Sequence, residues 1–273
     1  GHRAVLDEAK REAAKRGCGV TVLSFEPHPR RFFSAGQNML RLLPFHLKAR
    51  MLREEGVSLL VAQRFNRAFS HISAQDFIEQ VLITALGVAH VVTGEDFVFG
   101  HQRKGNAALL KETATRTHAF GYTALGRIGD DAHPISSTHI RQLIQSGDMA
   151  RAAKILGRPY CWLGRVIHGD KRGRTIGFPT ANILPPRIVM PSSGVYAVRV
   201  GLMGEDVMRP AIANLGVRPT VEGKTTLLEI HLFDCEMDLY GKRLHVDFVS
   251  FIRPEMVFEG IDALRKQIIA DCL

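Results

Sequence analysis

The order of secondary-structure patterns constrains the fold of this chain most, because the order changes once along the sequence. In residues 1–157, apolar strand-like runs alternate with amphipathic helical segments. The expected strands are 19–25, 57–65, 89–97 and 120–128, and the expected helices are 3–16, 45–56, 73–87 and 106–117, with Ser73 as a helix cap. Strands separated by helices usually pair in parallel. We therefore expect an α/β domain whose parallel sheet has helices on both faces.

The second part of the chain has a different pattern. Two short helical segments, 137–147 and 148–157, lead into short runs that are rich in Val and Ile and separated by Gly and Pro. The expected strands are 194–203, 208–217, 225–234 and 243–252, followed by a helix at 260–273. This pattern predicts an antiparallel β-barrel with a C-terminal helix. We place the domains at 1–157 and 158–273.

Composition narrows the possible functions. The chain has 36 Lys and Arg against 27 Asp and Glu, a net charge of +9, which favours a polyanionic or phosphorylated ligand. Only 7% of residues are aromatic and they do not alternate with the basic ones, which disfavours a nucleic-acid-binding protein with an OB-like module. The four cysteines are far apart, and no apolar run reaches about 18 residues. These features predict a cytoplasmic protein that binds neither nucleic acid nor membrane.

One loop concentrates glycine and positive charge. The segment HGDKRGRTIGFPTAN spans residues 168–182. Glycines let the backbone approach a ligand closely, and cations beside them neutralise phosphate oxygens, although a solvated hairpin is the alternative reading. The loop lacks the Walker pattern. The candidate ligand-binding residues are Gly169, Lys171, Arg172, Gly173, Arg174 and Gly177.

Oxygen donors follow the loop and recur in a later strand. Thr180 and Asn182 offer a hydroxyl and a carbonyl oxygen, which suit a magnesium ion that bridges ATP phosphates, although they could also cap a turn. Strand alternation places Leu228 and Ile230 on one face, and Glu229 and His231 on the other. A carboxylate there could accept the proton of a substrate hydroxyl during phosphoryl transfer, or it could be an ordinary surface residue.

Several segments together resemble a known family. GRVIHGDKRGRTIGFPTANI, GVYAVRV, ANLGVRPT, LEIHLFD, DLYGKRL and FIRPEMVF occur in this order and resemble the riboflavin kinase module over residues 160–273. FEPHPRRFF, LLPFHLK, VTGEDFVFGHQRKGN and ISSTHIRQLIQSGDMARAAKILGRPY resemble the FAD synthetase module. On these segments the chain is identified as a member of the bacterial bifunctional riboflavin kinase/FAD synthetases.

The resemblance implies a fold and roles for the second half. It implies a Greek-key barrel that binds ATP and riboflavin and releases ADP and FMN. Thr180 and Asn182 would hold magnesium, Glu229 would be the base for the ribityl 5′-hydroxyl, and Arg253 would lie beside the flavin. A flavin-binding module without turnover is the alternative, and the full set of Thr180, Asn182 and Glu229 argues against it.

For the first half, the resemblance implies a nucleotidylyltransferase-type sheet that converts FMN to FAD. Ser136, Ser137, Thr138 and Arg141 match the I-S-S-T-x-x-R motif for ATP phosphates, and His2 matches the end of the H-x-G-H motif. His28 and Asp96 match positions around the nucleotide and flavin. The alternative for His2 is a frayed terminus, and His28 or Asp96 could simply cap a turn.

The sequence begins at the end of that first motif. The preceding strand and the leading motif histidine are therefore not among the 273 residues. We therefore expect an N-terminally truncated domain that lacks its first strand. Because adenylyl transfer needs several phosphate-positioning groups together, we also expect FAD formation to be impaired in this chain.

Overall fold

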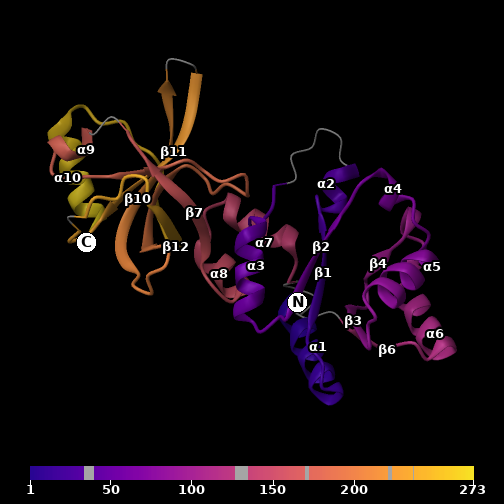
Figure 1. Ribbon diagram of the computed structural model, residues 1–273. Coiled ribbons are helices and arrows are strands. Elements are labelled where there is room, and N and C mark those ends of the chain that lie inside the picture. The colour runs from indigo at the N-terminus through magenta and orange to yellow at the C-terminus, as the bar shows by residue number, and fades with distance from the viewer. Residues whose placement is uncertain (34–39, 127–134, 170–171, 221–222, 236) are drawn as a thin grey trace. The chain divides into compact units, whose positions relative to one another are not determined.

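The computed structural model describes residues 1–33, 40–126, 135–169, 172–220, 223–235 and 237–273. The chain forms two compact units (Figure 1). Unit 1 comprises Gly1–Met39 and Phe45–Ile135, and unit 2 comprises Leu40–Pro44 and Ser136–Leu273. Each unit has its own apolar cluster of buried side chains.

Unit 1 is built on parallel strand pairs. The first pair is β1 (Thr21–Glu26) with β2 (Leu59–Arg64), and the second is β3 (His90–Gly94) with β6 (Gly121–Leu125). A short antiparallel pair joins β4 (Val98–Phe99) to β5 (Gly105–Asn106). The parallel pairing confirms the α/β prediction for this part of the chain.

Two helical segments of unit 1 begin at polar side-chain caps, of which Ser73 was expected from the sequence. Ser73 Oγ accepts a hydrogen bond from the backbone N–H of Asp76 at 3.0 Å, and Asn106 Oδ1 accepts one from Leu109 at 3.0 Å. The segment that Ser73 caps continues as a π-helix. The helices are α1 (His2–Arg16), α2 (Pro29–Phe33), α3 (Phe45–Glu54), α4 (Arg67–Ser70), α5 (Ala74–Asp76), the π-helix η1 (Phe77–Ala85), the 3₁₀-helix η2 (His101–Arg103) and α6 (Ala107–Thr117).

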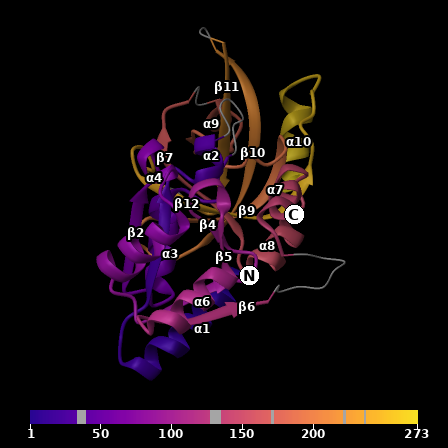
Figure 2. The ribbon, with the colours of Figure 1, turned by 90° about the vertical axis from the view of Figure 1, so that its right-hand side faces the viewer.

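Unit 2 contains a closed six-stranded barrel. Its strand order is β10-β11-β8-β7-β12-β9, and every pair is antiparallel. In Figures 1 and 2 the long β10–β11 hairpin extends beyond the other strands. The strands are β7 (Tyr160–Ile167), β8 (Ala181–Ile183), β9 (Gly194–Leu202), β10 (Arg209–Thr220), β11 (Gly223–Leu232) and β12 (Arg243–Arg253). The barrel and the C-terminal helix α10 (Ile261–Asp271) confirm the prediction.

Large aromatic side chains fill the barrel. Trp162, Tyr196 and Phe248 are fully buried, and the Trp162 and Phe248 rings meet edge to face with centroids 5.1 Å apart. Burying one such side chain contributes roughly 1.5 to 3 kcal/mol of transfer free energy. Alternate residues of the same strands, such as Cys161 and Asp247, therefore lie on the outer face of the barrel.

Two helices before the barrel pack with it. Helix α7 (Ser137–Gln145) and helix α8 (Met149–Leu156) bury apolar residues in the same cluster as the barrel strands. Gly157 ends α8 in the left-handed conformation, with φ of 71°. The main segment of unit 2 begins at Ser136, whereas the expected domain boundary at residue 157 remains a prediction.

Candidate functional site

Polar side chains form a row across three neighbouring barrel strands. The register of β11 and β8 places Glu229 opposite Asn182, and the register of β10 and β11 places Asn214 opposite Glu229. Cross-strand partners share one face of a sheet. Because Leu228 and Ile230 belong to the core, this row lies on the outer face. The structure thus brings together Asn182 and Glu229, which the sequence had assigned separately to metal binding and to proton transfer.

Asn182 is the polar residue of this row that water reaches least. It is only 5% exposed, and its Oδ1 has no hydrogen-bond partner within the described parts of the chain. Leaving such an acceptor unpaired costs roughly 1 to 3 kcal/mol. A Cβ atom at position 169 would lie 2.4 Å from Asn182 Nδ2, so the close approach of the loop requires Gly169. An unpaired buried oxygen under a glycine backbone fits a metal ligand.

Thr180 lies where the loop folds back on itself. The Phe178 backbone N–H donates a hydrogen bond to the Gly173 carbonyl at 2.8 Å. A Cβ atom on Gly173 would lie 2.3 Å from the Phe178 carbonyl oxygen and 3.4 Å from Thr180 Oγ1. Gly177 has a φ of +89°, which other residues rarely adopt. Two of the predicted loop glycines are therefore required by the backbone path that carries Thr180.

The basic part of the loop is partly helical. Arg172, Gly173 and Arg174 lie in α9 (Arg172–Thr175), a turn of helix that the sequence analysis did not predict. Lys171 lies outside the described residues, and the structure describes only the backbone of Arg172 and Arg174. Contacts of these three basic side chains with phosphate remain a prediction.

His231 contributes to the site without having been given a role from the sequence. Its Nδ1–H donates a hydrogen bond to the Pro179 carbonyl oxygen at 2.9 Å. Its ring also meets Phe178 edge to face, with centroids 5.2 Å apart. The alternation of β11 had placed His231 on the same face as Glu229. His231 thus anchors the segment immediately before Thr180.

Arg253 is engaged in a structural ion pair. Its Nε lies 2.9 and 3.0 Å from the two carboxylate oxygens of Asp271, and its Nη2 lies 2.7 Å from Oδ2. The Arg253 and Asp271 side chains are 15% and 4% exposed. This bidentate pair joins the end of β12 to α10. The expected flavin contact of Arg253 remains a prediction.

In unit 1 the three candidate residues occupy different local settings. His28 Nδ1 accepts a hydrogen bond from the Arg30 backbone N–H at 3.2 Å, so this histidine caps α2. Asp96 is exposed in the turn after β3. His2 is exposed at the start of α1.

In unit 2 the I-S-S-T-x-x-R residues lie at the start of α7. Ser136 Oγ accepts a hydrogen bond from the His139 backbone N–H at 3.2 Å and caps the helix. Ser137 and Thr138 occupy the exposed first turn, where backbone N–H groups have no partner within the helix. Arg141 Nε donates to the Leu40 carbonyl oxygen at 3.2 Å. This helix start suits a phosphate group.

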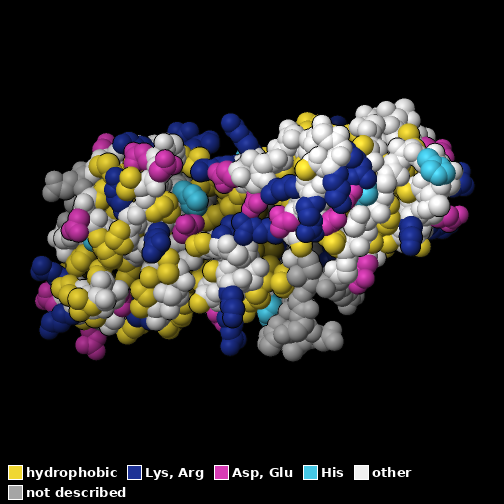
Figure 3. All heavy atoms as spheres, turned by 90° about the horizontal axis from the view of Figure 1, so that it is seen from below, with side chains coloured by type: hydrophobic (Ala, Val, Ile, Leu, Met, Phe, Trp, Pro, Cys, Tyr) yellow, Lys and Arg dark blue, Asp and Glu magenta, His cyan; other side chains and the backbone are white. Residues whose placement is uncertain are grey.

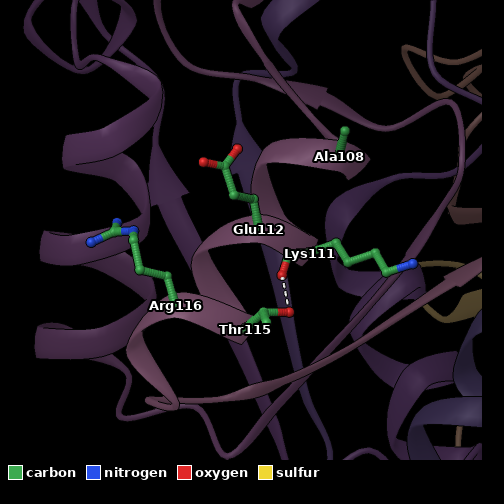
Figure 4. Close-up of a pocket in the computed structure, with 5 residues that line it drawn as sticks. All are labelled: Ala108, Lys111, Glu112, Thr115 and Arg116. Carbon is green, nitrogen blue, oxygen red and sulfur yellow. Dashed lines mark hydrogen bonds between the residues drawn. The ribbon is translucent and has the colours of Figure 1, made fainter.

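The depression that the surface of α6 forms does not include any of the candidate site residues. A shallow depression on α6 is lined by one face of that helix, and Figure 4 shows its Thr115 hydroxyl bonded to the Lys111 carbonyl. On the surface in Figure 3, Lys and Arg side chains are interspersed with Asp and Glu. No helix in the described residues is long and apolar enough to cross a membrane. The candidate site is therefore the outer face of β8 and β11 with the loop that precedes them.

A carboxylate beside a metal-compatible amide, next to a glycine-rich basic loop, is compatible with phosphoryl transfer from ATP, and the parallel α/β unit is of nucleotidyltransferase type. Family models agree with this class. The riboflavin kinase model matches residues 156–273, and the FAD synthetase model matches residues 1–139.

Individual relatives are similar over almost the whole chain. Bifunctional riboflavin kinase/FMN adenylyltransferases of Escherichia coli (strain K12) and Haemophilus influenzae are 42% and 40% identical, each over 99% of this chain and 86% and 87% of their own lengths. A crystal structure described as a macrolide-efflux protein from Streptococcus pneumoniae has a TM-score of 0.89 and 32% identity, and covers 99% of this chain and 87% of that one. The chain belongs to the family of bifunctional riboflavin kinase/FMN adenylyltransferases.

Proposed function

We propose that this chain makes FAD in two steps. In the first, the barrel transfers the γ-phosphoryl group of ATP to riboflavin and releases FMN and ADP. In the second, FMN attacks the α-phosphorus of another ATP, and FAD and pyrophosphate are released. The single observation that carries the proposal is the register that pairs Glu229 with Asn182 on the outer face of the barrel.

Glu229 is proposed as the general base of the first step. Its carboxylate would accept the proton of the ribityl 5′-hydroxyl while that oxygen bonds to the γ-phosphorus and the bond to ADP breaks. Glu229 is partly buried, so its position on the strand is held by the barrel while one side reaches solvent. His231 would keep the preceding loop in place through Pro179.

A divalent metal is generally used by kinases and adenylyltransferases of these families. We propose magnesium here, held by Thr180 Oγ1 and by Asn182 Oδ1. The unpaired Oδ1 and its glycine cover support this assignment. Bound there, the ion would neutralise charge on the ATP phosphate oxygens.

The loop backbone would complete the ATP site of the barrel. Gly169, Gly173 and Gly177 would let backbone N–H groups approach phosphate oxygens. Lys171, Arg172 and Arg174 would supply positive charge there. Arg253 is proposed to act beside the flavin through its position at the end of β12.

For the second step we propose phosphate binding at the start of α7. Ser136, Ser137, Thr138 and Arg141 would meet the β- and γ-phosphates. His2, His28 and Asp96 would act around the nucleotide and FMN.

The direct test supplies both substrates of the first step. The purified chain is incubated with riboflavin, ATP and magnesium chloride, and the flavins are separated by chromatography. We expect riboflavin to be converted to FMN and FAD, with one ADP formed for each molecule of FMN and FAD together. A chain that binds riboflavin but forms neither FMN nor FAD would be the non-catalytic flavin-binding module instead.

A further inference from the structure

A second group of ligating side chains lies on the outer face of the barrel, between β7 and β12. Cys161 offers a thiol, His245 an imidazole and Asp247 a carboxylate, and their ligand atoms all lie within 4.8 Å of one another. His245 Nε2 and Asp247 Oδ1 are 2.8 Å apart. None of these residues belongs to the proposed kinase site.

The strand register holds the three residues together. Asp247 pairs directly with Cys161, and His245 lies two residues earlier on β12, so all three side chains share one face. Asn182 pairs with Ile167 at the other end of β7. Ile167 lies six positions after Cys161 along the strand, which corresponds to roughly 20 Å. The group is therefore distinct from the site of riboflavin phosphorylation.

The donor chemistry selects a particular class of metal. Sulfur, nitrogen and oxygen donors together suit zinc and similar ions, whereas magnesium and calcium prefer oxygen alone. Cys161 is 1% exposed, while the His245 and Asp247 side chains are 23% and 19% exposed. Solvent therefore reaches one side of the group, where a water could be a fourth ligand.

Two neighbouring arginines bear on which metal ions can bind to this group of side chains. Arg158 Nη1 lies 3.6 Å from Cys161 Sγ, and Arg199 is the partner of Asp247 in the register. Their positive charge opposes the binding of all divalent cations to a similar degree. Only an ion that bonds strongly to sulfur and nitrogen overcomes this repulsion. We propose that Cys161, His245 and Asp247 form a zinc-binding site that links β7 to β12.

The test uses cobalt as a spectroscopic probe for the same ligands. The metal-free chain of 273 residues, in excess magnesium and a reducing agent, is titrated with Co²⁺ and then with Zn²⁺. We expect one equivalent of Co²⁺ to give a sulfur-to-cobalt charge-transfer band in the near ultraviolet, and Zn²⁺ to abolish it. A titration without this band would overturn the proposal.

Matched variants assign the sulfur donor. A triple variant, Cys18→Ser with Cys235→Ser and Cys272→Ser, retains only Cys161 and should keep the band, whereas Cys161→Ser should lose it. The opposite pattern would place the metal at another cysteine.

The two partly exposed ligands give a test that does not depend on the buried cysteine. His245→Gln and Asp247→Asn should each weaken zinc binding at least about tenfold. Removing a residue that only hydrogen-bonds to a metal ligand already lowers metal affinity roughly 10- to 100-fold. Riboflavin phosphorylation with magnesium should stay at the wild-type rate, which also shows that the variants fold. Wild-type zinc affinity in both variants would contradict the proposal, and failure of FMN formation in the wild-type chain would bear only on the proposed function.

Discussion

Asn182 is a buried amide between two core residues of β8, Ala181 and Ile183. The backbone hydrogen bonds of β8 do not require a polar side chain at this position. Its unpaired oxygen and the hydroxyl of Thr180 are the donors that we assign to magnesium. Asn182 pairs with Glu229 across the two strands, so the metal and the proton acceptor would act on one substrate.

Removing one of these donors should change the requirement for metal. Thr180→Ala loses one oxygen ligand, so we expect slower FMN formation that rises again when the magnesium concentration is raised. The measurement is the initial rate of FMN formation against magnesium concentration, with Thr115→Ala on the exposed face of α6 as the matched control. Identical magnesium curves for the two variants would show that Thr180 has a structural role.

Glu12 provides a residue-scale test of stability in unit 1. Hydrogen bonds from Lys15 and Arg16 lower the pKa of Glu12 to about 2, from 4.5. A lowered folded-state pKa stabilises the fold above the unfolded-state value, and the stabilisation is lost as pH falls from 4.5 toward 2. Glu12→Gln should therefore be less stable than the wild type at pH 7, with a difference that shrinks below pH 4.

Urea unfolding of the two proteins at several pH values measures this difference. Glu112→Gln, on the exposed face of α6, controls for the loss of one negative charge. A difference between wild type and Glu12→Gln that persists unchanged at pH 3 would mean that these ion pairs do not stabilise unit 1.

At the scale of elements, the loop of residues 168–180 is held against β11 from one side. His231 makes this contact through its Nδ1–H and the Pro179 carbonyl, and through the Phe178 ring. The loop carries the glycines and Thr180, so its position decides where ATP would bind. We regard His231 as a positioning residue.

Replacing His231 with Phe keeps the ring but removes the hydrogen bond. We expect the KM for ATP to rise several-fold while kcat changes less, because one hydrogen bond contributes about 1 kcal/mol and Glu229 is untouched. His231→Asn, which can still donate to Pro179, should recover part of the loss. Equal kinetics for wild type and His231→Phe would show that the hydrogen bond to Pro179 does not position the loop.

Elements differ in how far the sequence predicts them. The long helices and the strands with regular alternation were predicted because local pattern is enough to define them. Strand β8 has three residues and exists because β7 and β11 pair with it on either side, which is a tertiary effect. Helix α9 is likewise a single turn within a glycine-rich loop.

The same distinction applies to the site. The alternation of β11 placed Glu229 and His231 on one face, and the family resemblance suggested Thr180 and Asn182. The register between β8 and β11 could not be worked out from spacing, because the pairing is between distant segments. The ion pair between Arg253 and Asp271 was not foreseen for the same reason.

At the scale of the whole molecule, the candidate residues of the two chemical steps lie on different elements, although unit 2 contains members of both groups. The kinase candidates lie on the barrel, and the second motif of the adenylyltransferase lies at the start of α7. Variants of one group should therefore spare the other reaction.

Thr138→Ala tests this separation from the adenylyltransferase side. Loss of a hydroxyl at the start of α7 should slow the conversion of supplied FMN to FAD by roughly tenfold or more, since one donor to a charged group contributes about 1.5 to 3 kcal/mol. Riboflavin phosphorylation should be unchanged. Parallel assays of pyrophosphate release and of FMN formation measure the two rates, and an equal loss of both would argue that the steps share a site.

The most direct test of the central claim is the rate of riboflavin phosphorylation by Glu229→Gln. Loss of a general base should lower kcat by roughly two to four orders of magnitude, with little change in the affinity for ATP, while supplied FMN is still converted to FAD at the wild-type rate. Glu205→Gln, on the exposed turn after β9, serves as the control and should phosphorylate riboflavin normally. Phosphorylation by Glu229→Gln within a few-fold of the wild-type rate would contradict the account.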